Sequence, residues 1–223
     1  MKALRFAFLA FAAMLATAAG APNWNAVVKA ADGGHLIGNP YAKVKLIEFV
    51  SYTCPHCAHF AVDGDGALQL AYIGPGKVSV EVRHIVRDPV DLTAAVLANC
   101  GPAAKFPRNH AALMLGQSKW ITRVANTSKA QQARWYAGNG PSRRRAIASD
   151  AGFYTLMEGR GYNRTDVDKC LADEALAQRI AETSAADTQK WDVPGTPSIA
   201  INGALLAGTH DWRTLQPQID ARF

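Results

Sequence analysis

The residues of this chain best suited to chemistry are two cysteines that form a Cys-Pro-His-Cys motif at positions 54–57. A Cys-x-x-Cys pair can be half of a zinc site, a structural turn or a redox-active dithiol. A zinc site would need a second close pair, but the other two of the four cysteines, Cys100 and Cys170, are 70 positions apart. The spacing therefore favours a redox pair whose own disulfide is the working group, with no other cofactor and no metal.

The surroundings of the motif predict different roles for its two sulfurs. An apolar, β-branched run, Val44–Val50, precedes it and is typical of a strand buried on both faces of a sheet. A helical stretch follows, so Cys54 should lie at a helix N-terminus, where unpaired N–H groups and the macrodipole favour an anion. We expect Cys54 to be the exposed, low-pKa thiolate that attacks substrates. Cys57, one helical turn further, should be the less accessible resolving thiol.

Histidines in and near the motif suggest further chemistry. His56 can place positive charge or a ring N–H near the Cys54 sulfur, and the alternative is a merely surface-exposed histidine. His59 raises the question of haem, but haem attachment requires a histidine directly after the second cysteine, where Ala58 stands. Copper binding by the reduced pair is a secondary alternative. The motif thus predicts thiol chemistry assisted by His56.

One carboxylate interrupts the apolar strand. Glu48 lies six residues before Cys54, and burying it ionised would be costly, so we expect a raised pKa. The alternative is a glutamate at a sheet edge that faces solvent.

The elements that must position these residues follow from patterning. The chain has 223 residues, of which 49% are apolar, enough for a substantial core. The strand Val44–Val50, the helix and an alternating strand at 78–86 make a βαβ unit. Strands at Ser198–Ile201 and 204–206 form a hairpin about Asn-Gly, and a helix at 211–221 ends the chain. A short strand is also expected at 24–28. We predict an α/β thioredoxin-type βαβ…ββα fold, divided into 22–90, an inserted all-helical domain at 91–190, and 191–223.

The first residues have the order of a secretory signal peptide. Lys2 and Arg5 precede an apolar run at 6–19, which is shorter than the roughly 20 residues of a membrane span. We expect a signal peptide at 1–20, cleaved between 18 and 21. Its removal lowers the formal charge from +6 to +4, because two basic residues are lost. The arginines at 143–145 are interpreted as a solvated helix start, and no nucleic-acid-binding signature is present.

The segment 46–57 resembles the active-site strand and helix of the bacterial disulfide-bond-forming protein A (DsbA) group. The similarity is strong at 44–60 and 191–206 and loose through the helical insertion. It implies a thioredoxin fold, a periplasmic location and a dithiol/disulfide cycle. It also implies that Glu48 lies beneath the resolving cysteine and helps move its proton. Pro197 would be cis and pack against the redox pair, whereas the alternative is an ordinary trans-proline turn.

Two further features, at three positions, bear on this resemblance. Thr196, before the expected cis-proline, is more typical of the isomerase and reductase branch than of strong oxidases. Cys100 and Cys170 match family members with a second, non-catalytic disulfide, which would constrain the helical block by roughly 4 kcal/mol in the chain-entropy model. Two free buried thiols or a regulatory pair are the alternatives.

The leading hypothesis is a periplasmic oxidoreductase that donates a disulfide to unfolded or reduced exported proteins through a mixed disulfide at Cys54. By analogy with the family, a quinone-linked membrane partner would reoxidise it. We expect a monomer, because only a short segment precedes the predicted thioredoxin part. A disulfide isomerase or reductase is the nearest alternative, and a metal-binding or chaperone-like module is a third.

Overall fold

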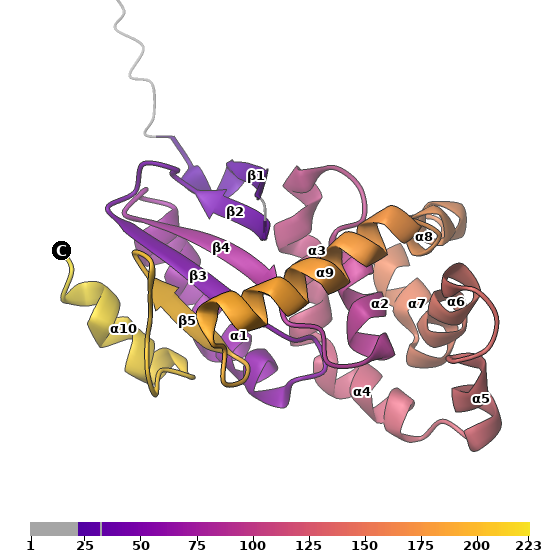
Figure 1. Ribbon diagram of the computed structural model, residues 1–223. Coiled ribbons are helices and arrows are strands. Elements are labelled where there is room, and N and C mark those ends of the chain that lie inside the picture. Colours follow the sequence, from indigo (N-terminus) through magenta and orange to yellow (C-terminus); the bar gives the residue numbers. More distant parts are fainter. Residues whose placement is uncertain (1–21, 32) are drawn as a thin grey trace, which may run out of the picture.

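The computed structural model describes residues 22–31 and 33–223, so the predicted signal peptide lies outside the described residues. A mixed sheet of six strands in the order β1-β2-β4-β3-β5-β6 organises this part of the chain (Figure 1). The strands are β1 (Val28–Ala31), β2 (Gly34–Gly38), β3 (Val44–Val50), β4 (Val78–His84), β5 (Ser198–Ile201) and β6 (Ala204–Leu205).

Strand β3 lies at the centre of the sheet and leads to the motif. It is parallel to β4 and antiparallel to β5, and β5 pairs with β6 in a hairpin. The β5–β6 turn uses Asn202 and Gly203, both at positive φ, as an Asn-Gly hairpin requires. With α1 between β3 and β4 and a last helix after β6, the βαβ…ββα order of the thioredoxin fold is confirmed.

Helices cover both faces of the sheet and extend beyond one end of it. They are α1 (Pro55–Ala67), α2 (Pro89–Ala98), α3 (Phe106–Leu115), α4 (Gln117–Ala125), α5 (Lys129–Arg134), α6 (Gly140–Ala151), α7 (Phe153–Glu158), α8 (Arg164–Leu171), α9 (Glu174–Trp191) and α10 (Trp212–Asp220). A π-helical segment, Leu68–Ile73, continues α1, and 3₁₀ turns occupy Trp24–Ala26 and Ala103–Lys105. Within residues 22–31 and 33–223, no helix combines the length and apolarity that crossing a membrane requires.

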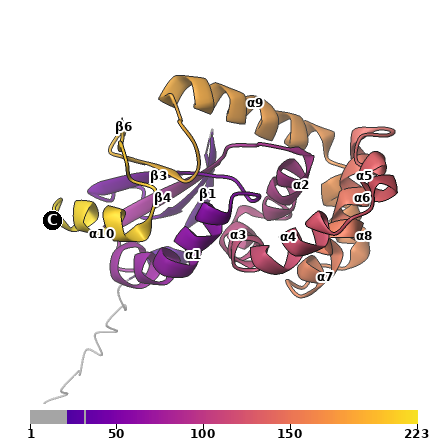
Figure 2. The same ribbon diagram turned by 90° about the horizontal axis from the view of Figure 1, so that it is seen from below.

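The two faces of the sheet are covered differently. Figure 2 shows α9 along one face, with α1, α3 and α10 on the other and the remaining helices grouped at one end. Side chains of β3 follow this division, since successive residues of a strand point to opposite faces. The Phe49 ring lies 5.5 Å from the Trp191 ring of α9, so the buried Leu46 and Val50 lie on the opposite face, which α1 covers.

The N-terminal part differs from the sequence prediction. The strand expected at 24–28 is wrong, because Trp24–Ala26 is a 3₁₀ turn and the chain then forms the β1–β2 hairpin at the sheet edge. Gly34 lets β2 approach β4 closely, since a Cβ there would lie 1.8 Å from the Val82 carbonyl oxygen. Strand β2 was missed because its glycine-rich sequence predicts a turn.

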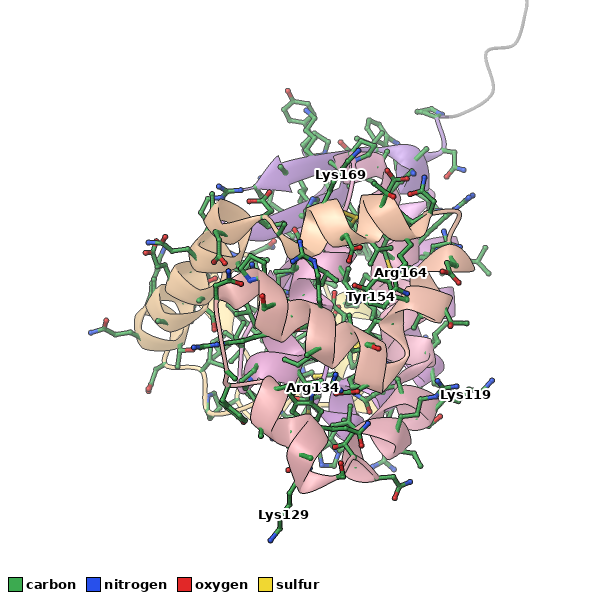
Figure 3. The ribbon with its side chains drawn as sticks, turned by 90° about the vertical axis from the view of Figure 1, so that its right-hand side faces the viewer. Lys119, Lys129, Arg134, Tyr154, Arg164 and Lys169 are labelled. Atoms are coloured by element: carbon green, nitrogen blue, oxygen red, sulfur yellow. A yellow bond between two sulfur atoms is a disulfide. The ribbon has the colours of Figure 1, made fainter. Side chains whose placement is uncertain are left out.

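The helical insertion also carries two corrections. The apolar spacing at 142–158 predicts one continuous helix, but Gly152, whose φ of 81° ends α6, breaks it. The arginines at 143–145 do begin a helix, but Arg144 is buried, donates to the Leu171 carbonyl at 2.7 Å and pairs with Glu174. Figure 3 shows the outer face of the insertion, where the Arg164 guanidinium lies over the Tyr154 ring at 4.0 Å.

Candidate active site

The motif lies at the junction between β3 and α1. Cys54 is the N-cap of α1, with extended backbone angles (φ −87°, ψ 118°), and Pro55 occupies the first helical position, where its missing N–H costs nothing. No side chain caps this helix end. The unpaired N–H groups of the first turn are therefore available to the Cys54 sulfur.

The two sulfurs have opposite electrostatic environments. The pKa of Cys54 is lowered to about 4, first because the Cys57 thiol donates a hydrogen bond to it and further by the backbone N–H groups of Cys57 and His56, while burial opposes the shift. Burial, followed by the hydrogen bond to Cys54, raises the pKa of Cys57. A thiolate at Cys54 beside a protonated Cys57 is the arrangement that separates an attacking sulfur from a resolving one.

Neither cysteine is exposed. Cys54 is 3% and Cys57 is 1% exposed, so the expectation of an exposed Cys54 is wrong. The reason is the loop before β5, whose Thr196 carbonyl lies 3.1 Å from the Cys54 sulfur and accepts a hydrogen bond when that thiol is protonated. The exposed side chains of Pro55 and His56 form the rim of the site.

The loop before β5 faces the motif with a cis peptide bond between Thr196 and Pro197, the isomer that the resemblance implies. Pro197 is buried and Thr196 is half-buried. The loop is held by the Ser198 hydroxyl, which donates to the Gly195 carbonyl at 2.8 Å, and by a ring nitrogen of His210, 2.7 Å from the Pro197 carbonyl oxygen. Sequence reasoning missed His210, and no sequence signal marks it.

His56 belongs to the motif and lies at the rim of the site. Its side chain is exposed, and its ring centroid is 6.4 Å from that of His59. The contact of His56 that lowers the pKa of Cys54 comes from its backbone N–H.

The helical insertion supports the backbone of the motif. The buried Gln117 amide, at the start of α4, donates to the carbonyls of Tyr52 at 2.6 Å and of Cys54 at 2.8 Å. Asp91 of α2 accepts hydrogen bonds from the Ser51 hydroxyl at 2.6 Å and the Tyr52 N–H at 2.7 Å. The sequence gives no sign of these contacts, because they join segments about 40 and 63–65 positions apart.

Glu48 is buried in β3, so the solvent-facing alternative does not apply. Burial, and after it the negative charge of Asp65, raises the pKa of Glu48. Burial likewise raises the pKa of Asp65, a residue of α1 that sequence reasoning missed. The two carboxylates line one cavity of about 520 Å³.

Three buried histidines lie between the sheet and the insertion. His35, His84 and His110 surround the Phe106 ring, with centroid distances of 4.0, 6.0 and 5.6 Å respectively. Burial lowers their pKa values to about 4, 3 and 4. A ring nitrogen of His110 lies 2.9 Å from the Tyr52 hydroxyl, which links this cluster to the residues before Cys54. Among the described residues, no group of three or more His, Cys, Asp or Glu side chains is arranged to hold a metal ion.

Cys100 and Cys170 form a disulfide in the structure, with a Cα–Cα distance of 5.5 Å. The bond joins the segment after α2 to α8, so it connects the beginning of the helical insertion to its later part.

Comparison with known proteins relates this geometry to characterised folds. The thioredoxin family model matches residues 30–221. The crystal structure of a protein-disulfide isomerase from Novosphingobium aromaticivorans is 50% identical, with a TM-score of 0.82 over 86% of this chain and 98% of that one. Wolbachia pipientis alpha-DsbA1 is 20% identical, with a TM-score of 0.63 over 83% of this chain and 88% of that one, and shows the fold alone.

Curated relatives extend the comparison by sequence. Proteins of Rickettsia conorii and Rickettsia felis that are named as protein-disulfide oxidoreductases are 25% and 34% identical over 86% of this chain. The chain spans 61% of the length of each of these two relatives.

Proposed function

Because the chain belongs to the thioredoxin family, we propose that it is a protein-disulfide oxidoreductase that works through a mixed disulfide at Cys54. The observation that carries this proposal is the pairing of a Cys54 sulfur whose pKa is about 4 with a Cys57 thiol whose pKa is raised. A sulfur that is stable as a thiolate is a good leaving group, and its stability favours the reduced form of the pair. The oxidised pair is therefore a good disulfide donor.

The proposed cycle moves two electrons from the substrate to the protein. A substrate thiolate attacks the Cys54 sulfur of the Cys54–Cys57 disulfide, the S–S bond breaks, and the Cys57 sulfur leaves with the electron pair and takes a proton. A second substrate thiolate then attacks the substrate sulfur of the mixed disulfide, and Cys54 leaves as a thiolate. The substrate departs oxidised and the pair is reduced.

The site geometry suits a protein substrate. The cis-Pro197 loop places its backbone beside the Cys54 sulfur, so an extended substrate segment can pair with it as an added strand. We propose that the substrates are unfolded or reduced exported proteins, that the protein works as a monomer in the periplasm after removal of the signal peptide, and that a quinone-linked membrane partner reoxidises it.

A disulfide isomerase is the second candidate. Thr196 before the cis-proline favours it, and the relative from Novosphingobium aromaticivorans carries the name protein-disulfide isomerase. The two functions differ in how readily the pair accepts electrons, because an isomerase must be kept reduced and an oxidase must be kept oxidised.

The deciding experiment is the reduction potential of the Cys54–Cys57 pair, measured by equilibration with glutathione. We expect a potential well above that of glutaredoxins, and a value in the glutaredoxin range or below would contradict the oxidase. Thr196→Val should shift this potential, and an unchanged potential would remove Thr196 as an argument for the isomerase. Failure to oxidise a dithiol peptide at all would favour a binding module without turnover.

A further inference from the structure

The cavity beside Glu48 connects the interior to the surface. Glu48 lies on the same face of β3 as Leu46 and Val50, the face that α1 covers, because side chains two positions apart share a face. Glu48 and Asp65 both line the cavity of about 520 Å³, and so do residues with exposed side chains, Gln69 and Arg108. The cavity therefore reaches from the buried carboxylate of Glu48 to solvent.

Asp65 lies between these two ends. It belongs to α1, two helical turns beyond Cys57, and is half-buried, whereas Glu48 is 6% exposed. The charge of Asp65 acts on Glu48, so the two carboxyl groups lie within electrostatic reach of each other, and the family resemblance implies that Glu48 lies beneath the resolving Cys57.

We propose that Asp65 is a second proton carrier, which passes protons through this cavity between Glu48 and solvent when the Cys54–Cys57 disulfide opens or closes. The proposal rests on the proposed thiol–disulfide exchange and holds for either direction of electron flow. A cavity of this volume has room for waters, and the carboxyl groups of Glu48 and Asp65 in its lining can hydrogen-bond to them and exchange protons through them.

The steps balance in both directions. When a substrate thiolate opens the disulfide, the Cys57 sulfur leaves with the electron pair and takes the Glu48 proton. Glu48 takes a proton from Asp65, and Asp65 takes one from solvent. When the pair closes, Cys57 gives its proton to the Glu48 carboxylate and attacks the Cys54 sulfur of the mixed disulfide, the bond to the substrate sulfur breaks and that sulfur leaves as a thiolate with the electron pair, and the proton leaves through Asp65.

The charges around the cavity agree with this role. Burial raises the pKa values of both carboxyl groups, so each can hold a proton near neutral pH. From α3, the neutral side chain of His110 and the cation of Arg108 also line the cavity. Two neighbouring carboxyl groups whose charges interact titrate as a pair, which is suited to passing one proton between them.

Asp65→Asn tests the proposal, because asparagine has about the size of aspartate but cannot take up and release a proton. The matched control is Asp63→Asn, an exposed aspartate of the same helix that does not line the cavity. The measurement is the stopped-flow rate at which the oxidised protein reacts with a dithiol peptide, followed as a function of pH, for wild type, Asp65→Asn, Glu48→Gln and the double variant.

We expect Asp65→Asn to slow the reaction at least about tenfold and to change its pH profile, within the range of general acid–base effects. Asp65→Glu should restore the rate. In the Glu48→Gln background, Asp65→Asn should add no further loss, because the two residues act in series. A rate equal to that of Asp63→Asn, or losses that multiply in the double variant, would overturn the proposal.

The carboxyl stretching band of Glu48, followed by infrared titration, gives a readout independent of turnover. Removing the neighbouring charge in Asp65→Asn should lower the pKa of Glu48, and an unchanged pKa would also contradict the relay. If wild type failed to exchange disulfides, the proposed function would fail while this titration still tested the coupling of the two carboxyl groups.

Discussion

The hydrogen bond from Cys57 to the Cys54 sulfur is the first cause of the low pKa of Cys54, so removing its donor should have a measurable effect. Cys57→Ala deletes the donor, whereas Cys57→Ser replaces the thiol with a hydroxyl that also donates. Both variants leave Cys54 as the N-cap of α1, with the backbone N–H groups of the first turn in place. Comparing them isolates one hydrogen bond.

The magnitude follows from the charge on the acceptor. A hydrogen bond to a charged group contributes about 1.5–3 kcal/mol, and each pKa unit corresponds to about 1.4 kcal/mol. Cys57→Ala should therefore raise the pKa of Cys54 by about one to two units from its value of about 4. The pKa should stay below that of an ordinary thiol, because the helix N-terminus still favours the thiolate.

The assay is the ultraviolet absorbance of the Cys54 thiolate as a function of pH, with the rate of alkylation by iodoacetamide as a second readout. Cys57→Ser should keep a pKa close to that of wild type. If Cys54 had the same pKa in Cys57→Ala and Cys57→Ser, the hydrogen bond from residue 57 would not be the main cause of its low pKa. The helix N-terminus would then be the main cause.

Three further predictions concern the support of the site. Because burial lowers the pKa values of His84 and His110, the unfolded chain binds more protons below about pH 6.5. The free energy of unfolding of the oxidised protein should fall from about pH 6.5 towards pH 4, by up to about 2.5 kcal/mol per histidine at about pH 4.5. Urea titrations check this, and a His110→Gln variant with an unchanged pH slope would contradict it. Gln117→Leu should cost about 1–3 kcal/mol, because it leaves a buried carbonyl unpaired, and should alter the alkylation rate of Cys54; an unchanged rate would make Gln117 a stability residue only. Replacing Cys100 and Cys170 with alanine should lower the free energy of unfolding by up to about 4 kcal/mol, since the bond closes a loop of 70 positions, and equal stability would show that the reduced chain already holds this geometry.

The sequence predicted the fold and the residues of the motif because both depend on local patterns. The apolar run of β3, the alternation of β4 and the Asn-Gly turn each set a structure within a few residues. Strand β2 was not predicted, because its glycines by themselves indicate a turn. They form a strand only because this segment lies close to β4 in the folded structure. The break at Gly152 was missed for a similar reason, because helical spacing continues on both sides of it.

By itself the sequence determined which residues bear the chemistry and the order of the elements that carry them. Side-chain type and spacing are properties of the chain, and they decide that Cys54 lies at the start of a helix. Tertiary structure alone decided how that chemistry is tuned. The Thr196 carbonyl buries the sulfur, Gln117 holds the backbone, and Asp65 shares a cavity with Glu48. These partners come from distant segments, and burial and charge interact only once folding has brought them within a few ångströms.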